Sequence, residues 1–210
     1  MASESVRLDR SCLVTVGATV GFKNLIESVL QPTFWEYLRS QGFTELHIQC
    51  GPDVEWATSK LASQGQHVPS GLTIDIFDVR KNLMKEEMTL CKPADGNRHL
   101  GLVISHAGTG TILDAWKLGL PLVVVPNTKL LNDHQTEMAK HLSKEGYAIM
   151  SSGSVDDLQE AIHKVELLWE ENKSRWPPNE VQPKETGRLR LWDLAPREVA
   201  KEENAYMVHD

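Results

Sequence analysis

The sequence predicts an α/β fold built on a doubly wound, mainly parallel sheet. Short apolar runs rich in β-branched residues alternate along the chain with stretches whose apolar residues recur at helical spacing. The connections between the runs have the length of crossovers rather than of hairpin turns, so neighbouring strands should be parallel.

The first half of the chain provides three of the predicted strands, over residues 12–16, 46–50 and 72–79. The first is β-branched, and the third alternates apolar and polar residues, which is typical of strands. Helical patterns follow over residues 22–30, 34–38 and 54–62, with a weaker one over 83–90. A polar loop over residues 92–99 closes this half.

The second half continues the alternation, with strands expected over residues 102–105, 122–125 and 147–150. Helices are expected over 111–118, 132–145 and 155–169, and Gly119 and Gly146 stop the first two. We therefore expect one nucleotide-sugar-binding, Rossmann-like domain over residues 1–172 and a C-terminal tail over 173–210. The tail contains an apolar cluster, and it is either disordered or a docking segment; the cluster comprises Leu189, Leu191, Trp192 and Leu194.

Charge and cysteine usage exclude several classes of protein. The formal net charge of −7 opposes binding to a phosphate backbone, so nucleic acid is not expected as a partner. Cys12, Cys50 and Cys91 are far apart in the sequence, which argues against a disulfide scaffold. The sequence contains neither a signal peptide pattern nor the roughly 20 apolar residues of a membrane span. These observations predict an intracellular, soluble chain.

The first candidate ligand loop comprises residues 17–21, directly after the first predicted strand. Gly17 and Gly21 would let the backbone approach an anion, with Thr19 between them. The spacing fits neither the dinucleotide fingerprint nor a P-loop. A tight turn that binds nothing is the alternative.

The second candidate loop comprises residues 105–111, again after a strand and before a helix. Gly108 and Gly110 would leave room for phosphates, and Thr109 or Thr111 could cap the helix. The positive end of the helix dipole suits a diphosphate, and His106 could supply a proton or a positive charge to a departing phosphate. A core histidine and a capping threonine are the alternatives.

Two further sets of polar residues would complete the rim. Asp114 lies one helical turn beyond the second loop, where its carboxylate could accept both hydroxyls of a ribose. Asn132, His134 and Gln135 begin the next predicted helix and could reach a sugar ring, although Asn132 is also a good N-cap. Metal-ligand clusters and nucleophile motifs do not occur in the sequence, so neither a metal nor a cofactor is expected.

These residues carry a family resemblance. The segments LVISHAGTGTILDAWKLGLPLVVVPN and NDHQTEMAKHLSKEGY, with the opening VTVGATVGF, resemble the donor-binding half of GT-B glycosyltransferases. Within them, the chain resembles the catalytic subunits of the two-subunit UDP-N-acetylglucosamine transferases of dolichol-linked N-glycan assembly. The resemblance covers residues 12 to about 169 and implies a single GT-B half.

The resemblance also implies residue roles. His106 would be catalytic, and Phe77 falls where relatives contact the uracil of UDP-GlcNAc. The substrate-binding set would be Gly17, Thr19, Phe77, Gly108, Thr109, Gly110, Asp114, Asn132, His134 and Gln135.

The implied reaction is a metal-independent, inverting single displacement. A membrane-anchored partner subunit would supply the acceptor half and recruit the chain to the cytosolic face of the endoplasmic reticulum, where the acceptor is a lipid-linked GlcNAc. The alternatives are a non-catalytic nucleotide-sugar-binding regulatory module and, less in keeping with the glycine spacing, a nicotinamide-dependent oxidoreductase.

Overall fold

The computed structural model describes residues 8–128 and 134–175, and within them six strands form one parallel sheet. The strand order is β3-β2-β1-β4-β5-β6, so the central strands are β1 and β4. Every predicted strand is present within two residues of its expected limits. The strands are β1 (Ser11–Thr15), β2 (Glu45–Gln49), β3 (Thr73–Phe77), β4 (Leu102–Ser105), β5 (Leu122–Val124) and β6 (Ile149–Met150).

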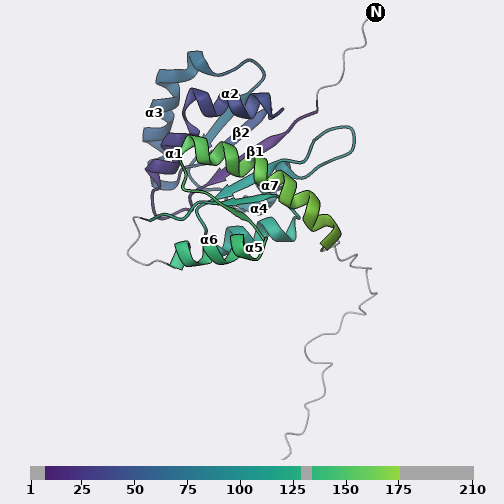
Figure 1. Ribbon diagram of the computed structural model, residues 1–210. Helices are drawn as coiled ribbons and strands as arrows, with labels where there is room; N and C mark the ends of the chain where they lie inside the picture. Colours follow the sequence, from purple (N-terminus) through teal and green to yellow (C-terminus); the bar gives the residue numbers. More distant parts are fainter. Residues whose placement is uncertain (1–7, 129–133, 176–210) are drawn as a thin grey trace, which may run out of the picture. The chain divides into compact units, whose positions relative to one another are not determined.

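Helices cover both faces of the sheet, as the doubly wound prediction requires (Figure 1). One face carries α1 (Lys23–Val29), α2 (Pro32–Ser40), α3 (Val54–Gln64) and α7 (Val155–Arg175). The other carries α4 (Leu83–Glu86), the short 3-10 helix η3 (Met88–Cys91), α5 (Thr109–Lys117) and α6 (His134–Lys144).

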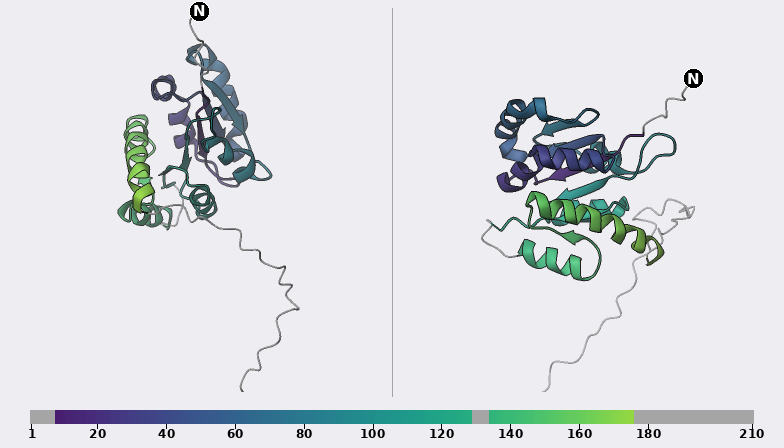
Figure 2. Two further views of the ribbon diagram at one scale, coloured as in Figure 1. Left: turned by 90° about the vertical axis from the view of Figure 1, so that its right-hand side faces the viewer. Right: turned by 45° about the horizontal axis from the view of Figure 1, so that its top comes forward.

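The larger core lies under α1, α2 and α7. Helix α2 buries Phe34, Trp35 and Leu38 at helical spacing, and the indole Nε1 of Trp35 donates to the carbonyl of Val29 at 2.9 Å. Each such side chain contributes about 1.5–3 kcal/mol by leaving water. The phenol of Tyr37 donates to the carbonyl of Gln159 at 2.8 Å, which fixes α7 beside α2 (Figure 2).

Helix α7 begins in a hydrogen-bonded turn. Asp157 Oδ2 accepts from the backbone N–H of Ser152 at 2.5 Å, and Ser154 Oγ accepts from the N–H of Asp157 at 3.4 Å. The bond from the Ser152 N–H lowers the pKa of Asp157. The helix runs to Arg175, six residues beyond its predicted end.

The weak helical pattern over residues 83–90 divides into two short helices. Helix α4 ends at Glu86, and Glu87 is the capping residue, with a φ of −116° that is far from the usual helical value of about −63°. Helix η3 then buries Met88 and Cys91 against the sheet. The predicted single helix is therefore wrong at Glu87, whose side chain turns toward the sheet.

All three cysteines are buried and free. Burial raises the pKa of the Cys50 and Cys91 thiols to about 12. Among the residues that the structure describes, no helix combines the length and the apolar character that crossing a bilayer requires.

Candidate functional site

The strand order reverses between β1 and β4, and the loops that follow these two strands meet there. Gly17, two residues after β1, has a φ of +84° that favours glycine. A Cβ atom on Gly17 would lie 3.0 Å from the Cε1 of His106, and one on Gly108 would lie 2.6 Å from its Nε2. The two glycines therefore flank the imidazole of His106. Ligands of open α/β sheets bind at this switch point, outside the carboxyl ends of the strands.

A single carbonyl holds His106 in place. The carbonyl oxygen of Thr15 accepts from the backbone N–H of His106 at 3.1 Å and lies 3.2 Å from its Nδ1. Because a carbonyl only accepts, Nδ1 carries the proton and Nε2 presents a lone pair toward Gly108. Burial lowers the pKa of His106, against the opposing effect of the Thr15 carbonyl, so the ring is neutral at neutral pH. The expected positive charge on this ring would require a bound anion to raise its pKa.

Helix α5 begins immediately after this histidine. Ala107 has a positive φ of 63°, which is uncommon for a residue with a side chain, and it turns the chain from β4 into the helix. Gly108 is the N-cap and no side chain caps the helix, so the predicted cap by Thr109 or Thr111 is wrong. The N–H groups of a first helical turn have no intrahelical partners, and here they face the switch point without a capping side chain.

The loop after β2 supports the loop after β1 and was not among the loops predicted from the sequence. Gly51 opens the 3-10 helix η1 (Gly51–Asp53) with a φ of +52°, and a Cβ there would lie 2.8 Å from the Gly17 carbonyl oxygen. A Cβ on Gly21 would lie 2.2 Å from Asp53 Oδ2. Asp53 also pairs with Lys23, at 3.8 Å. The tripeptide Gly-Pro-Asp directly after a strand was the available signal.

The predicted phosphate and ribose residues lie around α5 and the first loop. Thr19, Thr109 and Gly110 are exposed. Asp114 is partly buried, and its carboxylate pairs with Lys117 Nζ at 3.1 Å on the same helix. Thr19 thus lies in the loop after β1, whereas Thr109, Gly110 and Asp114 lie on α5, the helix that follows β4.

The predicted uracil and sugar residues have other neighbours. Phe77 ends β3 and is buried, with the guanidinium of Arg80 4.3 Å above its ring. Gln135 Oε1 accepts from the backbone N–H of Asn127 at 3.0 Å. His134 is exposed at the start of α6. Asn132 lies outside the described residues.

A hollow at the opposite edge of the sheet is unrelated to these loops. Its lining comes from residues before β1, β2 and β4 and from the last turns of α7. Arg10 lines this hollow and donates to the carbonyls of Leu100 and Gln41 and to Glu166. Ligands of parallel sheets bind at the carboxyl edge instead.

A six-stranded parallel sheet whose glycine loops meet at the switch point is a Rossmann-like fold, the architecture of one half of a GT-B glycosyltransferase. Comparison with known families agrees, because residues 11–186 match the glycosyltransferase family 28 C-terminal domain. The chain belongs to this family, and its class is that of glycosyltransferases.

Individual relatives are consistent with this assignment. The chain is similar to the UDP-N-acetylglucosamine transferase subunit ALG13 of Cryptococcus neoformans, at 35% identity over 79% of this chain and 88% of the relative. The solution structure of an ALG13 protein superimposes with a TM-score of 0.57 and 26% identity, over 76% of this chain and 87% of the other. The MurG crystal structure from Acinetobacter baumannii gives a TM-score of 0.54 and 25% identity, over 77% of this chain but 43% of MurG.

Proposed function

We propose that this chain is the UDP-GlcNAc-binding catalytic subunit of a transferase in N-glycan precursor assembly. With a membrane-anchored partner it would transfer GlcNAc to dolichyl-diphosphate-GlcNAc and so form the chitobiosyl lipid. The observation that carries the proposal is the packing of Gly17 and Gly108 around His106 at the switch point, beside the uncapped start of α5. The similarity to proteins named as UDP-N-acetylglucosamine transferase subunits supports the choice of sugar nucleotide.

The donor would lie along the carboxyl edge with its diphosphate at the start of α5. The first-turn N–H groups and the helix dipole would stabilise negative charge on the diphosphate as UDP leaves. The Nε2 lone pair of neutral His106 could take up a proton there, because its Nδ1–H is already held by Thr15. Asp114 would hold the ribose, and Gln135 the sugar hydroxyls. The reaction would be an inverting single displacement.

The acceptor side would come from the partner. The matched part of this chain covers 43% of MurG, so in this proposal the partner takes the place of the remaining part of that fold. Positioning the acceptor hydroxyl against the anomeric carbon is worth roughly 7–11 kcal/mol in favourable cases, so the chain alone should transfer almost nothing. In this proposal residues 1–172 bind the donor. The segment 173–210, most of which lies outside the described residues, helps to dock on a partner at the cytosolic face of the endoplasmic reticulum.

Calorimetry with UDP and UDP-GlcNAc tests the donor site. Loss of a charged hydrogen bond costs about 1.5–3 kcal/mol, so Asp114→Ala should weaken both ligands about ten- to a hundredfold. Gln135→Ala should weaken UDP-GlcNAc and spare UDP. Lys117→Ala is the matched control, because it breaks the same ion pair but keeps the carboxylate. Equal losses in Asp114→Ala and Lys117→Ala would contradict the ribose role.

An assay for the disaccharide lipid tests the partner. The purified chain, UDP-GlcNAc and a dolichyl-diphosphate-GlcNAc analogue should give product only when membranes containing the partner are added. Truncation before Leu189 should reduce that activity. Donor binding without turnover under all conditions would instead identify a regulatory module, and efficient transfer by the lone chain would refute the need for a partner.

A further inference from the structure

Strand β2 carries a polar stripe on the face of the sheet that packs against η3. Parallel sheets are usually apolar on both faces, yet Glu45 and His47 point this way, and Gln49 shares their face by strand alternation. Glu45 and Gln49 have hydrogen-bond partners on β1, because Ser11 Oγ donates to Glu45 at 2.6 Å and Thr15 Oγ1 donates to Gln49. The central residue of the stripe, His47, faces carboxylates instead of a hydroxyl.

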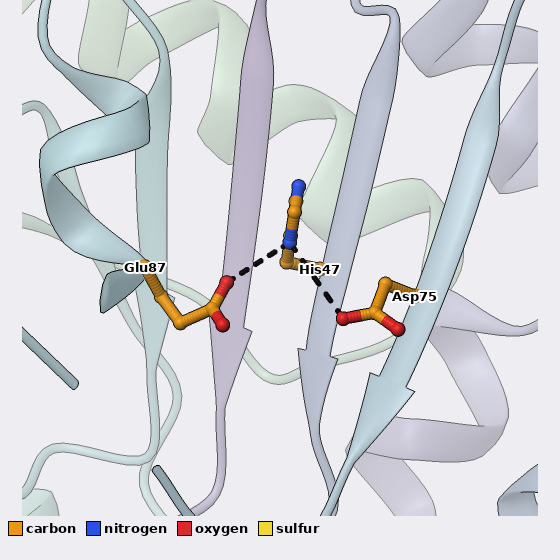
Figure 3. A group of neighbouring side chains, drawn as sticks. All are labelled: His47, Asp75 and Glu87. Carbon is orange, nitrogen blue, oxygen red and sulfur yellow. Dashed lines mark ion pairs between the residues drawn. The ribbon is translucent and has the colours of Figure 1, made fainter. Parts of the chain in front are cut away.

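Three carboxylates surround the imidazole of His47. The strand register places it opposite Asp75 of β3, whose Oδ2 lies 4.0 Å from Nδ1 (Figure 3). Glu87 reaches over the sheet from the break between α4 and η3, and its Oε2 lies 3.0 Å from the same nitrogen. On the other side of the ring, Nε2 lies 3.5 Å from Glu45 Oε2.

Two atoms of this group are buried without a hydrogen bond. Glu87 is 5% exposed, and neither its Oε2 nor His47 Nδ1 has a hydrogen-bond partner, although the two atoms are neighbours. The two atoms form an ion pair at 3.0 Å when Nδ1 carries a proton, and a metal ion bound to both atoms would satisfy them equally.

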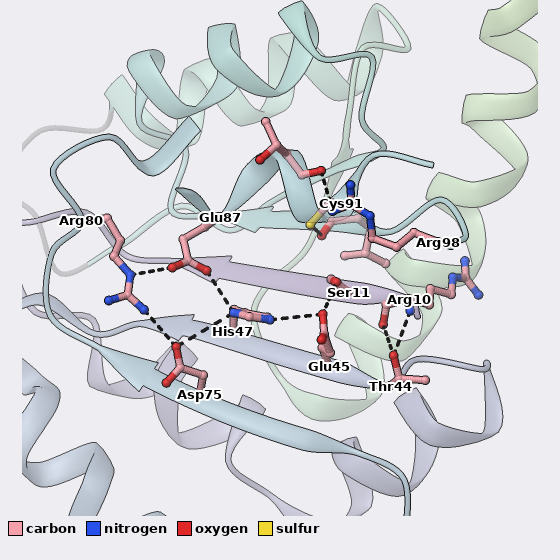
Figure 4. Close-up of polar contacts among 12 residues, drawn as sticks. Arg10, Ser11, Thr44, Glu45, His47, Asp75, Arg80, Glu87, Cys91 and Arg98 are labelled. Atoms are coloured by element: carbon pink, nitrogen blue, oxygen red, sulfur yellow. Dashed lines mark hydrogen bonds and ion pairs between the residues drawn. The ribbon is translucent and has the colours of Figure 1, made fainter. Parts of the chain in front are cut away.

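The charge of the group points the same way. Arg80 donates to Glu87 Oε1 at 2.5 Å and to Asp75 Oδ2 at 3.1 Å (Figure 4). The three carboxylates and this single guanidinium together carry two negative charges, with the imidazole left out of the sum. A divalent cation would balance them.

We propose that His47, Asp75 and Glu87 form a binding site for a divalent transition metal of the Zn²⁺ class. The ligand atoms would be His47 Nδ1, an Asp75 oxygen and Glu87 Oε2, which all lie within 4.8 Å of one another. The edge of a tetrahedral zinc site with bonds of about 2.1 Å is about 3.4 Å, so small side-chain movements suffice. Glu45 would accept the Nε2–H of His47 and thereby direct the Nδ1 lone pair to the metal, as carboxylates do for metal-bound histidines.

The site would be structural and separate from the donor loops. Its ligands lie in mid-strand on β2 and β3 and in the segment after α4, so the metal would join these three parts of the fold. Arg80 could keep its bond to Glu87 Oε1 while Oε2 binds the metal. The inference goes beyond the proposed transferase reaction and does not depend on it.

The test is a calorimetric titration of the chelator-treated full chain with Zn²⁺ alone. Asp75→Asn and His47→Gln should each weaken binding at least tenfold, and Glu45→Gln should weaken it by roughly 10–100-fold. Asp75 is half-exposed on the edge strand β3, so Asp75→Asn keeps the comparison valid if another variant fails to fold. His163→Gln is the matched control, because this histidine is exposed on α7 and should leave the affinity unchanged.

Cobalt substitution gives a second readout that requires no variant. The Co²⁺-loaded wild-type chain should show d–d absorption of a nitrogen–oxygen site, without the near-ultraviolet charge-transfer band of thiolate ligation. The inference is overturned if Zn²⁺ binds the wild type no more tightly than Asp75→Asn and His47→Gln. It is equally overturned if a thiolate band places the metal on a cysteine.

Discussion

Replacing Gly108 with alanine should destabilise the chain through one contact. The added Cβ would lie 2.6 Å from Nε2 and 2.7 Å from Cε1 of His106. Non-bonded carbon contacts are optimal at about 3.5–4.0 Å, so the ring must move by about 1 Å. Gly108 has a φ of −75° and a ψ of 126°, which alanine adopts without strain. The contact with His106 is therefore the main perturbation, to which the exchange of glycine for alanine at the N-cap adds a smaller cost.

The expected loss of stability follows from the contacts that the His106 ring loses when it moves. Overpacking costs about 1–3 kcal/mol. Loss of the Nδ1–H bond to Thr15 alone would account for about 0.5–1.5 kcal/mol. We expect the free energy of unfolding, measured by chemical denaturation, to fall by about 1–3 kcal/mol. Gly110→Ala is the control, since a Cβ there meets nothing within 4 Å and alanine is favoured in helices by up to about 1 kcal/mol.

A double-mutant cycle decides whether this account is right. In a His106→Ala background the space next to Gly108 is empty, so the Gly108→Ala cost should fall by at least about 1 kcal/mol and leave only the cost of alanine at the N-cap. An equal loss of unfolding free energy in both backgrounds would refute the reasoning. In that case the glycine would be required for its backbone rather than for the ring.

Three further predictions concern stability. Burial lowers the pKa of His106 in the folded state, so the contribution of His106 to the free energy of unfolding is present above the unfolded-state pKa near 6.5 and is lost as the pH falls through the folded-state pKa. Chemical denaturation at pH 7.5 and at pH 5 should therefore show that the wild type is more stable than His106→Ala by a smaller margin at pH 5. Asp157→Asn should cost about 1 kcal/mol by thermal unfolding at pH 7, and that difference should disappear in acid, because the Ser152 N–H favours the carboxylate. Gly101→Ala should cost about 3 kcal/mol or more, because its Cβ would lie 2.1 Å from a β1 carbonyl oxygen, whereas Gly65→Ala should be neutral or stabilising in the same assay.

The sheet could be predicted from the sequence because each strand is a short apolar run between turn residues. The end of α7 could not be predicted from the sequence, because the apolar periodicity of this helix stops at Trp169. Side-chain bonds to loops hold its last turns, from Trp169 Nε1 to the Gly119 carbonyl and from Asn172 Nδ2 to the Gly146 carbonyl, both at 2.8 Å. Such contacts between distant segments leave no local pattern.

The candidate site was predictable in its place but not in its packing. Strand ends of a parallel sheet share one edge, so the grouping of Gly17 with His106 followed from the topology. The glycine pattern predicts space for phosphate beside Gly108, whereas the imidazole of His106 occupies that space. Likewise, the sequence contains no metal-ligand spacing, since His47, Asp75 and Glu87 approach one another only through strand register and the bend after α4.

The central position of β1 has a consequence for the order in which the sheet is assembled. Strands β2 and β3 follow β1 in the chain and extend the sheet from one of its edges, whereas the opposite edge pairs with β4. During synthesis, domains fold as the chain emerges, so that second edge waits unpaired until residues 102–105 have been made. An open apolar edge is a template for pairing with other chains. The nascent protein is therefore most prone to aggregation between completion of β3 and arrival of β4.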